Sequence, residues 1–395
     1  MELTKKQKEG LEIAIDRYKK GERYTVISGY AGTGKSTLVN FIIKALIQEG
    51  VKEDEIVFTS FTGKACNVLK QKGNKEVKTL HKLLYKSIPK REGGYIRIPL
   101  DTIEYKVVVV DEISMAPMSL IQLLSKHDAY VICLGDPFQL PPVDKKEDNH
   151  LLDNPHIFLD EIMRQAAESE IIQLTMKIRK GEEIPYFKGK EVQVIKREEL
   201  NTGMLLWADQ VLVATNDQRV SINNQVRQLL GRGEKPEDGD KVICLRNYWD
   251  IYSSKKTPLI NGSIGYLKDC YISKINLPTF VSPQRKNINF LRAKFTDELG
   301  ETYGELSMDN KLILTGENSL DWKEQYRLSR SHKYAWMVPL EFTYGYAITT
   351  HKAQGSEWDK VLVLEEKFPF NKEEHARWLY TACTRSSSKL VLVRP

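Results

Sequence analysis

One segment, residues 29–36 with the sequence GYAGTGKS, constrains the fold of this chain more than any other. It follows a short β-rich run at residues 24–28 and precedes a helical pattern at residues 36–49. Backbone N–H groups of such a glycine-rich loop can approach a bound phosphate, and the positive end of the helix dipole strengthens the attraction. The segment predicts a nucleotide-binding loop at the edge of a parallel sheet; the plainer alternative is a glycine-rich turn that caps a helix.

The residue types in this loop predict roles in binding ATP and Mg²⁺. The side chain of Lys35 is expected to reach the β- and γ-phosphates, and the hydroxyl of Ser36 is expected to ligate Mg²⁺. The loop residues predicted to bind the nucleotide are Gly32, Thr33, Gly34, Lys35, Ser36 and Thr37.

Two further segments predict catalytic groups beside the loop. The hydrophobic run at residues 107–110 ends at Asp111 and Glu112, so Asp111 is expected to hold the magnesium's water shell and Glu112 to polarise an attacking water. Gln139, in the sequence GDPFQLPP after the next strand, is expected near the γ-phosphate if these strands are neighbours. Taken alone, the acids could belong to a solvated loop and Gln139 to an ordinary proline-rich turn.

The wider pattern predicts an α/β fold with two parallel-sheet domains. Apolar runs at residues 56–60, 106–111 and 130–134 alternate with helical patterns, and a second set lies at 210–214, 360–364 and 389–393. Nearly continuous apolar strands that alternate with helices are typical of a parallel sheet covered on both faces. A chain of 395 residues, 41% of them hydrophobic, is long enough for two such cores.

Two segments interrupt this alternation. Residues 87–100 have short extended runs on either side of Gly93 and Gly94, which predicts a small hairpin. Residues 234–336 have short β-like runs separated by Gly, Pro and Asn turns, with little helical periodicity before Glu317, which predicts an inserted β-rich module.

The charge and the cysteines narrow the class of protein only slightly. A net charge of +6 and a pI near 8.8 favour a polyanionic partner without requiring one. The sequence has no apolar run of the ~18 residues that a membrane span needs, so we expect a soluble, cytoplasmic protein that does not bind membranes. The five cysteines are scattered, without the spacing of a zinc site.

The ordered set of motifs resembles superfamily 1 helicases of the RecD/Dda type, the 1B group. The matching segments run in order from about residue 3 to residue 393: GYAGTGKST, FTSFTGKA, TLHKLL, VVVVDEIS, LGDPFQLPP, MRQ, VLVATN, YAITTHKAQGSEWD and YTACTRSSSKLVLV. The resemblance implies two RecA-like domains with ATP in the cleft between them, single-stranded DNA as partner and movement from 5′ to 3′. It also implies a monomer that acts on forked duplexes, with replication or repair proteins as possible partners.

The resemblance also implies how the chain is divided. The hairpin and the β-rich module correspond to the family's 1B insertion and SH3-like 2B insertion. The implied parts are domain 1A at residues 1–86 and 101–172, 1B at 87–100, domain 2A at 173–233 and 337–395, and 2B at 234–336.

Carried over to this sequence, the family's motifs assign further residues to the nucleotide. Gln7 resembles the glutamine that contacts adenine, although Thr4 and Gln7 also fit a capping box. Arg164 and Arg385 resemble arginine fingers that stabilise the charge on the γ-phosphate, although either could be a structural ion-pair partner. Gly355 and Glu357 lie in the turn that the resemblance gives to coupling between ATP and strand.

Other motif residues are implied to contact the nucleic acid, although each could also be an ordinary surface residue. The implied strand-binding residues are Phe61, Thr62, Lys64, His81, Thr215, Asn216, Thr350 and His351. On the hairpin, Tyr95 or Ile96 is the candidate pin that stacks under the last base pair of a fork, unless these side chains are buried against their own domain.

The leading hypothesis is therefore an ATP-dependent DNA helicase. An RNA helicase or remodelling ATPase would share the same core, because most strand contacts of such motors go to the backbone. A phosphate-loop kinase or a nucleotide-dependent binding protein is the alternative from another class, but neither needs a second α/β domain and paired arginines.

Overall fold

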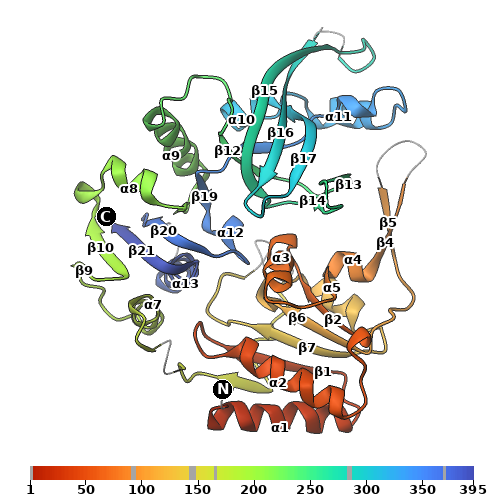
Figure 1. Ribbon diagram of the computed structural model, residues 1–395, viewed down its shortest axis with the longest axis vertical. Helices are drawn as coiled ribbons and strands as arrows, with labels where there is room; N and C mark the ends of the chain where they lie inside the picture. Colours follow the sequence, from red (N-terminus) through yellow and green to blue (C-terminus); the bar gives the residue numbers. More distant parts are fainter. Residues whose placement is uncertain (1–2, 90–94, 142–147, 164–166, 283–286, 368–370) are drawn as a thin grey trace. The chain divides into compact units, whose positions relative to one another are not determined.

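The computed structural model describes residues 3–89, 95–141, 148–163, 167–282, 287–367 and 371–395. The chain divides into two compact units (Figure 1). Unit 1 consists of Met1–Lys86, Pro99–Leu200 and Thr350–Pro395, and unit 2 consists of Ser87–Ile98 and Asn201–Thr349. Both halves of the predicted nucleotide site, the phosphate loop and Arg385, belong to unit 1.

The first sheet of unit 1 is entirely parallel, with the strand order β3-β2-β6-β7-β1-β8. Its strands are β1 (Tyr24–Gly29), β2 (Ile56–Ser60), β3 (Val77–Thr79), β6 (Val107–Asp111), β7 (Tyr130–Gly135) and β8 (Ile157–Leu159). The helices and turns that connect them are α1 (Lys5–Lys19), α2 (Lys35–Gln48), η1 (Glu53–Glu55), α3 (Gly63–Gln71), α4 (Leu80–Leu84), η2 (Ile113–Met115) and α5 (Met118–Leu124).

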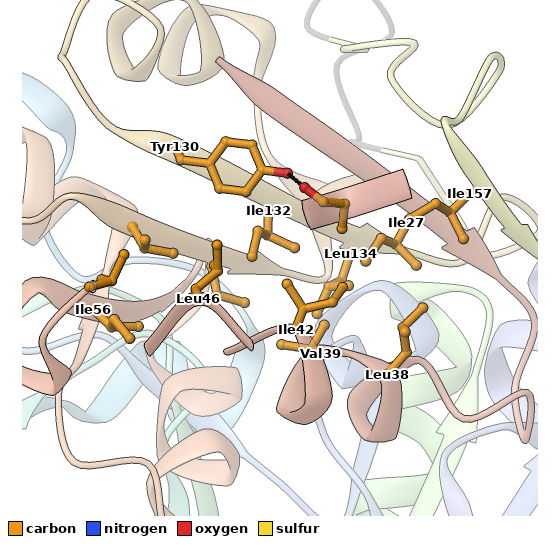
Figure 2. Close-up of a cluster of buried hydrophobic side chains, with 14 of the residues drawn as sticks. Ile27, Leu38, Val39, Ile42, Leu46, Ile56, Tyr130, Ile132, Leu134 and Ile157 are labelled. Atoms are coloured by element: carbon orange, nitrogen blue, oxygen red, sulfur yellow. Dashed lines mark hydrogen bonds between the residues drawn. The ribbon is translucent and has the colours of Figure 1, made fainter. Parts of the chain in front are cut away.

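Alternating side chains of this sheet enter two separate cores. Val107 and Val109 of β6 pack on one face in the same core as Leu38 and Ile42 of α2; Figure 2 shows this core with Leu38 and Ile42 labelled. Val108 and Val110, from the same strand, pack on the other face against helices α4 and α5. Because successive strand residues point to opposite faces, a continuous apolar run requires helices on both sides. The carboxyl ends of β1, β6 and β7 are thereby left at one edge, which is where polar loops can form a site.

The second part of unit 1 carries four neighbouring strands in the order β20-β21-β10-β9, among which only the β10–β9 pair is antiparallel. Its strands are β9 (Phe187–Lys188), β10 (Val192–Lys196), β20 (Trp358–Leu364) and β21 (Ser386–Arg394). The accompanying helices are α7 (Glu170–Lys180), η4 (Arg197–Glu199), α12 (Thr350–Ala353) and α13 (Lys372–Cys383). Residues 378–383 of α13 are all buried, so this helix packs as a core element.

Unit 2 is built around a five-stranded antiparallel sheet with the order β17-β16-β15-β12-β18. Its strands are β12 (Lys241–Cys244), β15 (Ile264–Asn276), β16 (Asn287–Asp297), β17 (Thr302–Asp309) and β18 (Phe342–Tyr344). Around it lie the pairs β13 (Tyr248–Tyr252) with β14 (Pro258–Leu259) and β11 (Gln210–Val213) with β19 (Ala347–Thr349). Its helices are α8 (Thr202–Trp207), α9 (Asn216–Leu229), α10 (Asn310–Thr315), α11 (Trp322–Ser329) and η5 (Ala335–Met337).

The predicted elements are largely confirmed, with differences of one to three residues at their ends. The predicted hairpin is present as β4 (Tyr85–Pro89) paired with β5 (Tyr95–Pro99). The expectation of little helix before Glu317 is wrong at one place: Asn310–Thr315 forms α10, because Asp309 caps its N-terminus through the backbone N–H of Leu312 and Gly316 ends it in the left-handed conformation. Among the helices that the structure describes, none combines the length and apolarity needed to cross a membrane.

Replacing Ile42 by Ala tests the packing of the first core. Ile42 is fully buried and Ile47 of the same helix is 37% exposed, so Ile42→Ala is expected to lower the free energy of unfolding by ~2–5 kcal/mol through the cavity that it leaves. Ile47→Ala is the matched control and should cost less than about 1 kcal/mol. Urea unfolding followed by circular dichroism measures both, and equal losses for the two variants would contradict this account of the core.

Candidate active site

The phosphate loop is held in shape by bonds to its own carbonyl groups. The Lys35 ammonium donates to the carbonyl oxygens of Gly29 at 2.6 Å and Tyr30 at 3.0 Å, and the Thr33 hydroxyl donates to the Tyr30 carbonyl at 2.8 Å. Gly34 has φ +79°, and a Cβ atom there would collide with the side-chain amide of Gln7. Glycine is therefore required at this position by both conformation and space, and the amino group of Lys35 lies over the concave side of the loop.

Gln7 connects the first helix to this loop. Its side-chain oxygen accepts from the Thr4 backbone N–H at 3.0 Å, which completes the capping box, and its Nε2 donates to the carbonyl oxygens of Thr33 at 3.4 Å and Gly34 at 3.3 Å. The capping box is thus confirmed, while contact with adenine stays a prediction. Gln7 is only 1% exposed, and its two bonds to the loop carbonyls support the phosphate loop. The sequence did not indicate this role.

The two acids occupy the end of β6, as predicted. Asp111 is the last residue of β6, and Glu112 follows in the left-handed conformation with φ 53°. Its backbone N–H donates to Asp111 Oδ1 at 3.0 Å. Burial, together with the adjacent Glu112 charge, raises the pKa of Asp111 to about 6. Burial disfavours the charged form of this carboxyl, and a cation bound beside it would stabilise that form.

Gln139 bridges Glu112 and Arg385. With its amide oriented to satisfy both neighbours, Gln139 donates to Glu112 Oε2 at 3.1 Å and accepts from Arg385 Nη2 at 3.2 Å. Arg385 also donates to the carbonyl oxygens of Thr381 at 3.1 Å and Ser356 at 3.3 Å. Gln139 and Arg385 are both buried, so this chain of contacts lies in a low-dielectric environment where charge interactions are strong.

These groups line one cleft within unit 1. One wall carries the phosphate loop and the acids, and the other carries the turn before β20 and the end of α13. The lining residues are Ala31, Lys35, Ala65, Val68, Lys72, Asp111, Glu112, Asp136, Gln139, Gly355, Ser356, Glu357, Thr384 and Arg385. Motif residues as far apart in sequence as Lys35 and Arg385, which are separated by 350 positions, thus line the same cleft.

A buried tyrosine, which sequence reasoning missed, ties the two walls together. The Tyr380 hydroxyl accepts from the backbone N–H of Ala31 at 2.9 Å and donates to Asp136 Oδ2 at 2.6 Å. Burial and the neighbouring carboxylate raise the pKa of Tyr380, and burial raises the pKa of Asp136. The hydroxyl therefore stays protonated and remains a donor. The available signal was the position of Tyr380 inside the motif YTACTRS.

The rest of the loop at residues 136–140 is held by the same helix and by Gln354, which precedes β20. The backbone N–H of Leu140 donates to the Thr381 hydroxyl at 3.0 Å, and the Leu140 carbonyl accepts from Gln354 Nε2 at 2.7 Å. Arg377 donates to the Pro137 carbonyl at 3.0 Å. The loop that carries Gln139 is therefore fixed on both sides by side chains of the second wall.

Three predicted strand-binding residues of the first sheet lie close together. The rings of Phe61 and His81 are 5.7 Å apart, and His81 stacks on Tyr85 at 6.1 Å, which adds a residue that the sequence did not indicate. The Thr62 hydroxyl caps α3 by accepting from the Ala65 N–H at 3.2 Å. These groups stand at the carboxyl end of β2 and the helices that follow it.

Lys64, predicted to contact a phosphate of the strand, lies against an aromatic ring of the second wall. Its ammonium stands 4.2 Å from the ring centre of Trp358, the first residue of β20. Beside this contact, Gly355 has φ +72°, and a Cβ atom there would come within 3.1 Å of the Thr62 hydroxyl and within 3.0 Å of the Ala65 Cβ. Glycine permits α3 and the turn before β20 to approach, so Lys64 contributes to the joining of the two walls.

The remaining predicted residues fall in several places. Thr215 caps α9 through the Gln218 N–H at 3.3 Å, and Asn216 is the first residue of that helix. Thr350 is fully buried, whereas His351 is partly exposed and burial lowers its pKa. Arg164 lies outside the described residues, as do the side chains of the two pin candidates Tyr95 and Ile96.

The donor set at the cleft fits Mg²⁺. This ion keeps several waters and usually takes one or two carboxylates together with substrate phosphates. Asp111 and Lys35 both line the cleft, and Ser36 follows Lys35 as the second residue of α2. Among the residues that the structure describes, no cluster of three or more His, Cys, Asp or Glu is present that could hold a metal ion.

Comparisons with known proteins identify the family. Residues 2–198 match the family described as AAA domain, and residues 344–393 match the UvrD-like helicase C-terminal domain. The ATP-dependent RecD2 DNA helicase of Deinococcus radiodurans is 27% identical over 403 residues, covering 98% of this chain and 49% of that protein. The chain belongs to the superfamily 1B helicases. The ATP-dependent DNA helicase dda of Enterobacteria phage T4 is 33% identical over 153 residues, covering 37% of this chain and 34% of that protein.

The fold of this superfamily 1B chain is also that of a solved relative. A structure of Pif1 helicase from Bacteroides in complex with ADP-AlF3 and ssDNA has a TM-score of 0.54 and 17% identity, covering 99% of this chain and 92% of that chain. The predicted class, two RecA-like parallel-sheet domains with a hairpin insertion and a β-rich insertion, is confirmed. The matched regions span half or less of the two curated helicases named above.

Replacing Tyr380 by Phe tests the tie between the walls. The change keeps the ring but removes the acceptor for the Ala31 N–H and the donor to Asp136. We expect the free energy of unfolding to fall by ~1–3 kcal/mol and the amide hydrogens of residues 29–36 to exchange faster with solvent. Hydrogen exchange read by mass spectrometry measures the second effect.

Tyr130→Phe is the matched control, because the Tyr130 hydroxyl is bonded to Thr25 at 2.6 Å and to the Ala14 carbonyl at 2.7 Å within the first core. It should cost similar stability without changing exchange in the phosphate loop. If the amide hydrogens of residues 29–36 exchange at the same rate in Tyr380→Phe as in the unaltered chain, the Tyr380 hydroxyl does not hold the phosphate loop.

Proposed function

We propose that this chain is an ATP-dependent DNA helicase that moves from 5′ to 3′ along single-stranded DNA and separates the strands of a forked duplex. The observation that carries the proposal is the single cleft lined by Lys35, Asp111 and Glu112 from one sheet and by Gly355 and Arg385 from the other. A kinase needs only the first wall, whereas a motor needs a nucleotide that touches both.

The roles of the cleft residues follow from charge. Lys35 and the magnesium ligands Ser36 and Asp111 would hold the triphosphate, and the ion would neutralise charge between the β- and γ-phosphates. Glu112 would orient and polarise the attacking water, and Arg385 would stabilise the negative charge that spreads over the transferred phosphoryl group. Arg164 is proposed as the second arginine at the same phosphate.

Gln139 would couple the two events. Its amide contacts both Glu112 and Arg385, at 3.1 and 3.2 Å, so a movement of the arginine toward a γ-phosphate changes the hydrogen bond that fixes the acid. Binding of ATP would therefore draw the walls together, and loss of the γ-phosphate would release them. Alternating closure and release would move the strand if the two grips on it loosen in turn.

The proposed strand contacts lie on both units. On unit 1 the proposed contacts are the neighbouring rings of Phe61 and His81, together with Thr62, Lys64 and His351. On unit 2 they are Thr215 and Asn216. Helix N-termini such as those capped by Thr62 and Thr215 favour phosphate oxygens, while rings can stack on bases. The proposed pin is Tyr95 or Ile96 on the hairpin.

Loss of Lys35 is the first test of the assigned site. Lys35→Ala is expected to lower the rate of ATP hydrolysis and of unwinding by at least about 100-fold, because the phosphates lose their main cation. Lys44→Ala, on the exposed face of the same helix, is the control and should keep both activities. Phosphate-release and strand-separation assays measure them; near-normal unwinding by Lys35→Ala would refute the site.

Loss of Arg385 separates binding from turnover. Arg385→Ala is expected to retain ATP binding and to lose hydrolysis by roughly 10³–10⁵-fold, as in related phosphate-loop enzymes. Arg377→Ala, on helix α13 shortly before Arg385 and bonded to Pro137 rather than to Gln139, should lose far less. Binding is measured with a fluorescent ATP analogue, and if Arg385→Ala abolishes it while circular dichroism is unchanged, the finger role is wrong.

The choice of polymer and direction has its own test. ATP hydrolysis is compared with equal lengths of single-stranded DNA and RNA, and unwinding is compared on duplexes that carry only a 5′ or only a 3′ tail. We expect stimulation by DNA and unwinding from the 5′ tail. Stimulation by RNA alone would make the chain an RNA helicase, and unwinding from the 3′ tail alone would reverse the proposed direction.

A further inference from the structure

Helix α11 and the turn after it expose large aromatic rings to solvent. Trp322 is 72% exposed, Tyr326 is 54% exposed and Trp336 is 53% exposed. Exposed rings on this scale are unusual for a folded surface and mark places where another molecule binds. The α11 surface is defined here by six residues: Trp322, Lys323, Tyr326, Arg330, Lys333 and Trp336 (α11 is labelled in Figure 1).

The exposure of these rings is set by how the helix is anchored. Leu328 of α11 is fully buried in a core with Ile288 and Phe290 of β16. A capping box between Asp321 and Glu324 fixes the first turn. Because Trp322 and Tyr326 are four residues apart, they stand one above the other on the opposite face, ~6 Å apart along the axis. The helix therefore presents a fixed row of rings to solvent.

Cations accompany the rings. The Lys323 ammonium lies 5.6 Å from the centre of the Trp322 ring, and the Arg330 guanidinium lies 5.6 Å from the centre of the Tyr326 ring and donates to its hydroxyl at 3.2 Å. The indole N–H of Trp336 donates to the Lys333 carbonyl at 3.0 Å. Residues 322–336 contain four Lys and Arg and one acid, and that acid, Glu324, is buried in its cap.

Rings interleaved with cations fit one class of polymer best. Unpaired bases stack on aromatic faces in any sequence, while Lys and Arg meet the phosphates between them. The core of a protein–protein interface is depleted of Lys, yet Lys323 and Lys333 flank the exposed rings. A paired duplex hides its base faces in its own stack, so the rings favour single strands.

We propose that the α11 surface is a second binding site for single-stranded DNA, in which Trp322 and Tyr326 stack on unpaired bases and Lys323, Arg330 and Lys333 meet phosphates. This proposal depends on the proposed function in one respect, the choice of DNA as the bound polymer. The surface adds nucleotides to the bound length, and it takes no part in ATP hydrolysis.

The test is equilibrium binding without nucleotide, followed by fluorescence anisotropy of labelled oligo(dT). The double variant Trp322→Ala with Tyr326→Ala should bind a long oligo(dT) at least about 5-fold more weakly, the lower end of the cost of removing a stacking ring. Replacing Lys323 and Lys333 by Gln should reduce the slope of log K against log salt by about 1.4, since each phosphate contact on a single strand contributes ~0.7.

A matched control is available on unit 1. Tyr186 is 47% exposed and has the Lys196 ammonium 5.6 Å from its ring centre, so Tyr186→Ala removes an exposed ring with a neighbouring cation. It should leave binding unchanged. Binding by the double variant within twofold of the unaltered chain, or an equal loss with Tyr186→Ala, overturns the proposal. An equal loss on a blunt duplex also overturns it, because stacking requires unpaired bases.

Failure of the helicase proposal gives a different pattern. The double variant should keep the basal rate of ATP hydrolysis, and Lys35→Ala should keep its affinity for long oligo(dT). If DNA does not accelerate ATP hydrolysis but the double variant still loses affinity for oligo(dT), the α11 binding site is supported and the helicase proposal is refuted. If hydrolysis responds to DNA but the double variant binds normally, the motor stands and the α11 surface is refuted.

Discussion

The buried hydroxyl of Tyr380 is the contact on which the nucleotide site depends. It bonds the phosphate loop at Ala31 and the loop after β7 at Asp136, while its own helix ends near Arg385. A typical hydrogen bond contributes ~0.5–1.5 kcal/mol and one to a charged group ~1.5–3 kcal/mol, so the two bonds of this side chain make a substantial contribution to the contact between the walls. It acts together with the bonds of Leu140 to Thr381 and Gln354, which join the same two walls.

The contacts of Gln139 connect the two walls of the cleft. Gln139 is held by the loop at residues 136–140, which the second wall fixes through Thr381 and Gln354. Its amide then reaches both Glu112 and Arg385. An altered charge at the phosphate therefore acts on the acid, the amide and the arginine together. Packed and hydrogen-bonded interfaces change between discrete arrangements, and the proposed function requires such a change at the cleft.

The sequence predicted what local patterns determine. The alternation of Val107 to Val110 requires helices on both faces, and the strand, loop and helix around GYAGTGKS follow from residue types alone. Contacts between distant residues gave no such signal: Tyr380 and Asp136 are 244 positions apart, and Lys64 and Trp358 meet only because Gly355 lets α3 approach. Periodicity can show that α11 has two faces but not which one is buried; the burial of Leu328 in the core leaves Trp322 and Tyr326 on the exposed face.

The most direct measurement of the central claim is the distance between the two walls in different nucleotide states. Spin labels are placed at Glu12→Cys on α1 and Lys372→Cys on α13, with the partly exposed Cys270 replaced by Ser; the other four native cysteines are buried. Electron paramagnetic resonance should give a shorter distance with Mg²⁺ and a non-hydrolysable ATP analogue than without nucleotide, and a longer one again with ADP. One unchanged distance distribution in all three states would contradict the account.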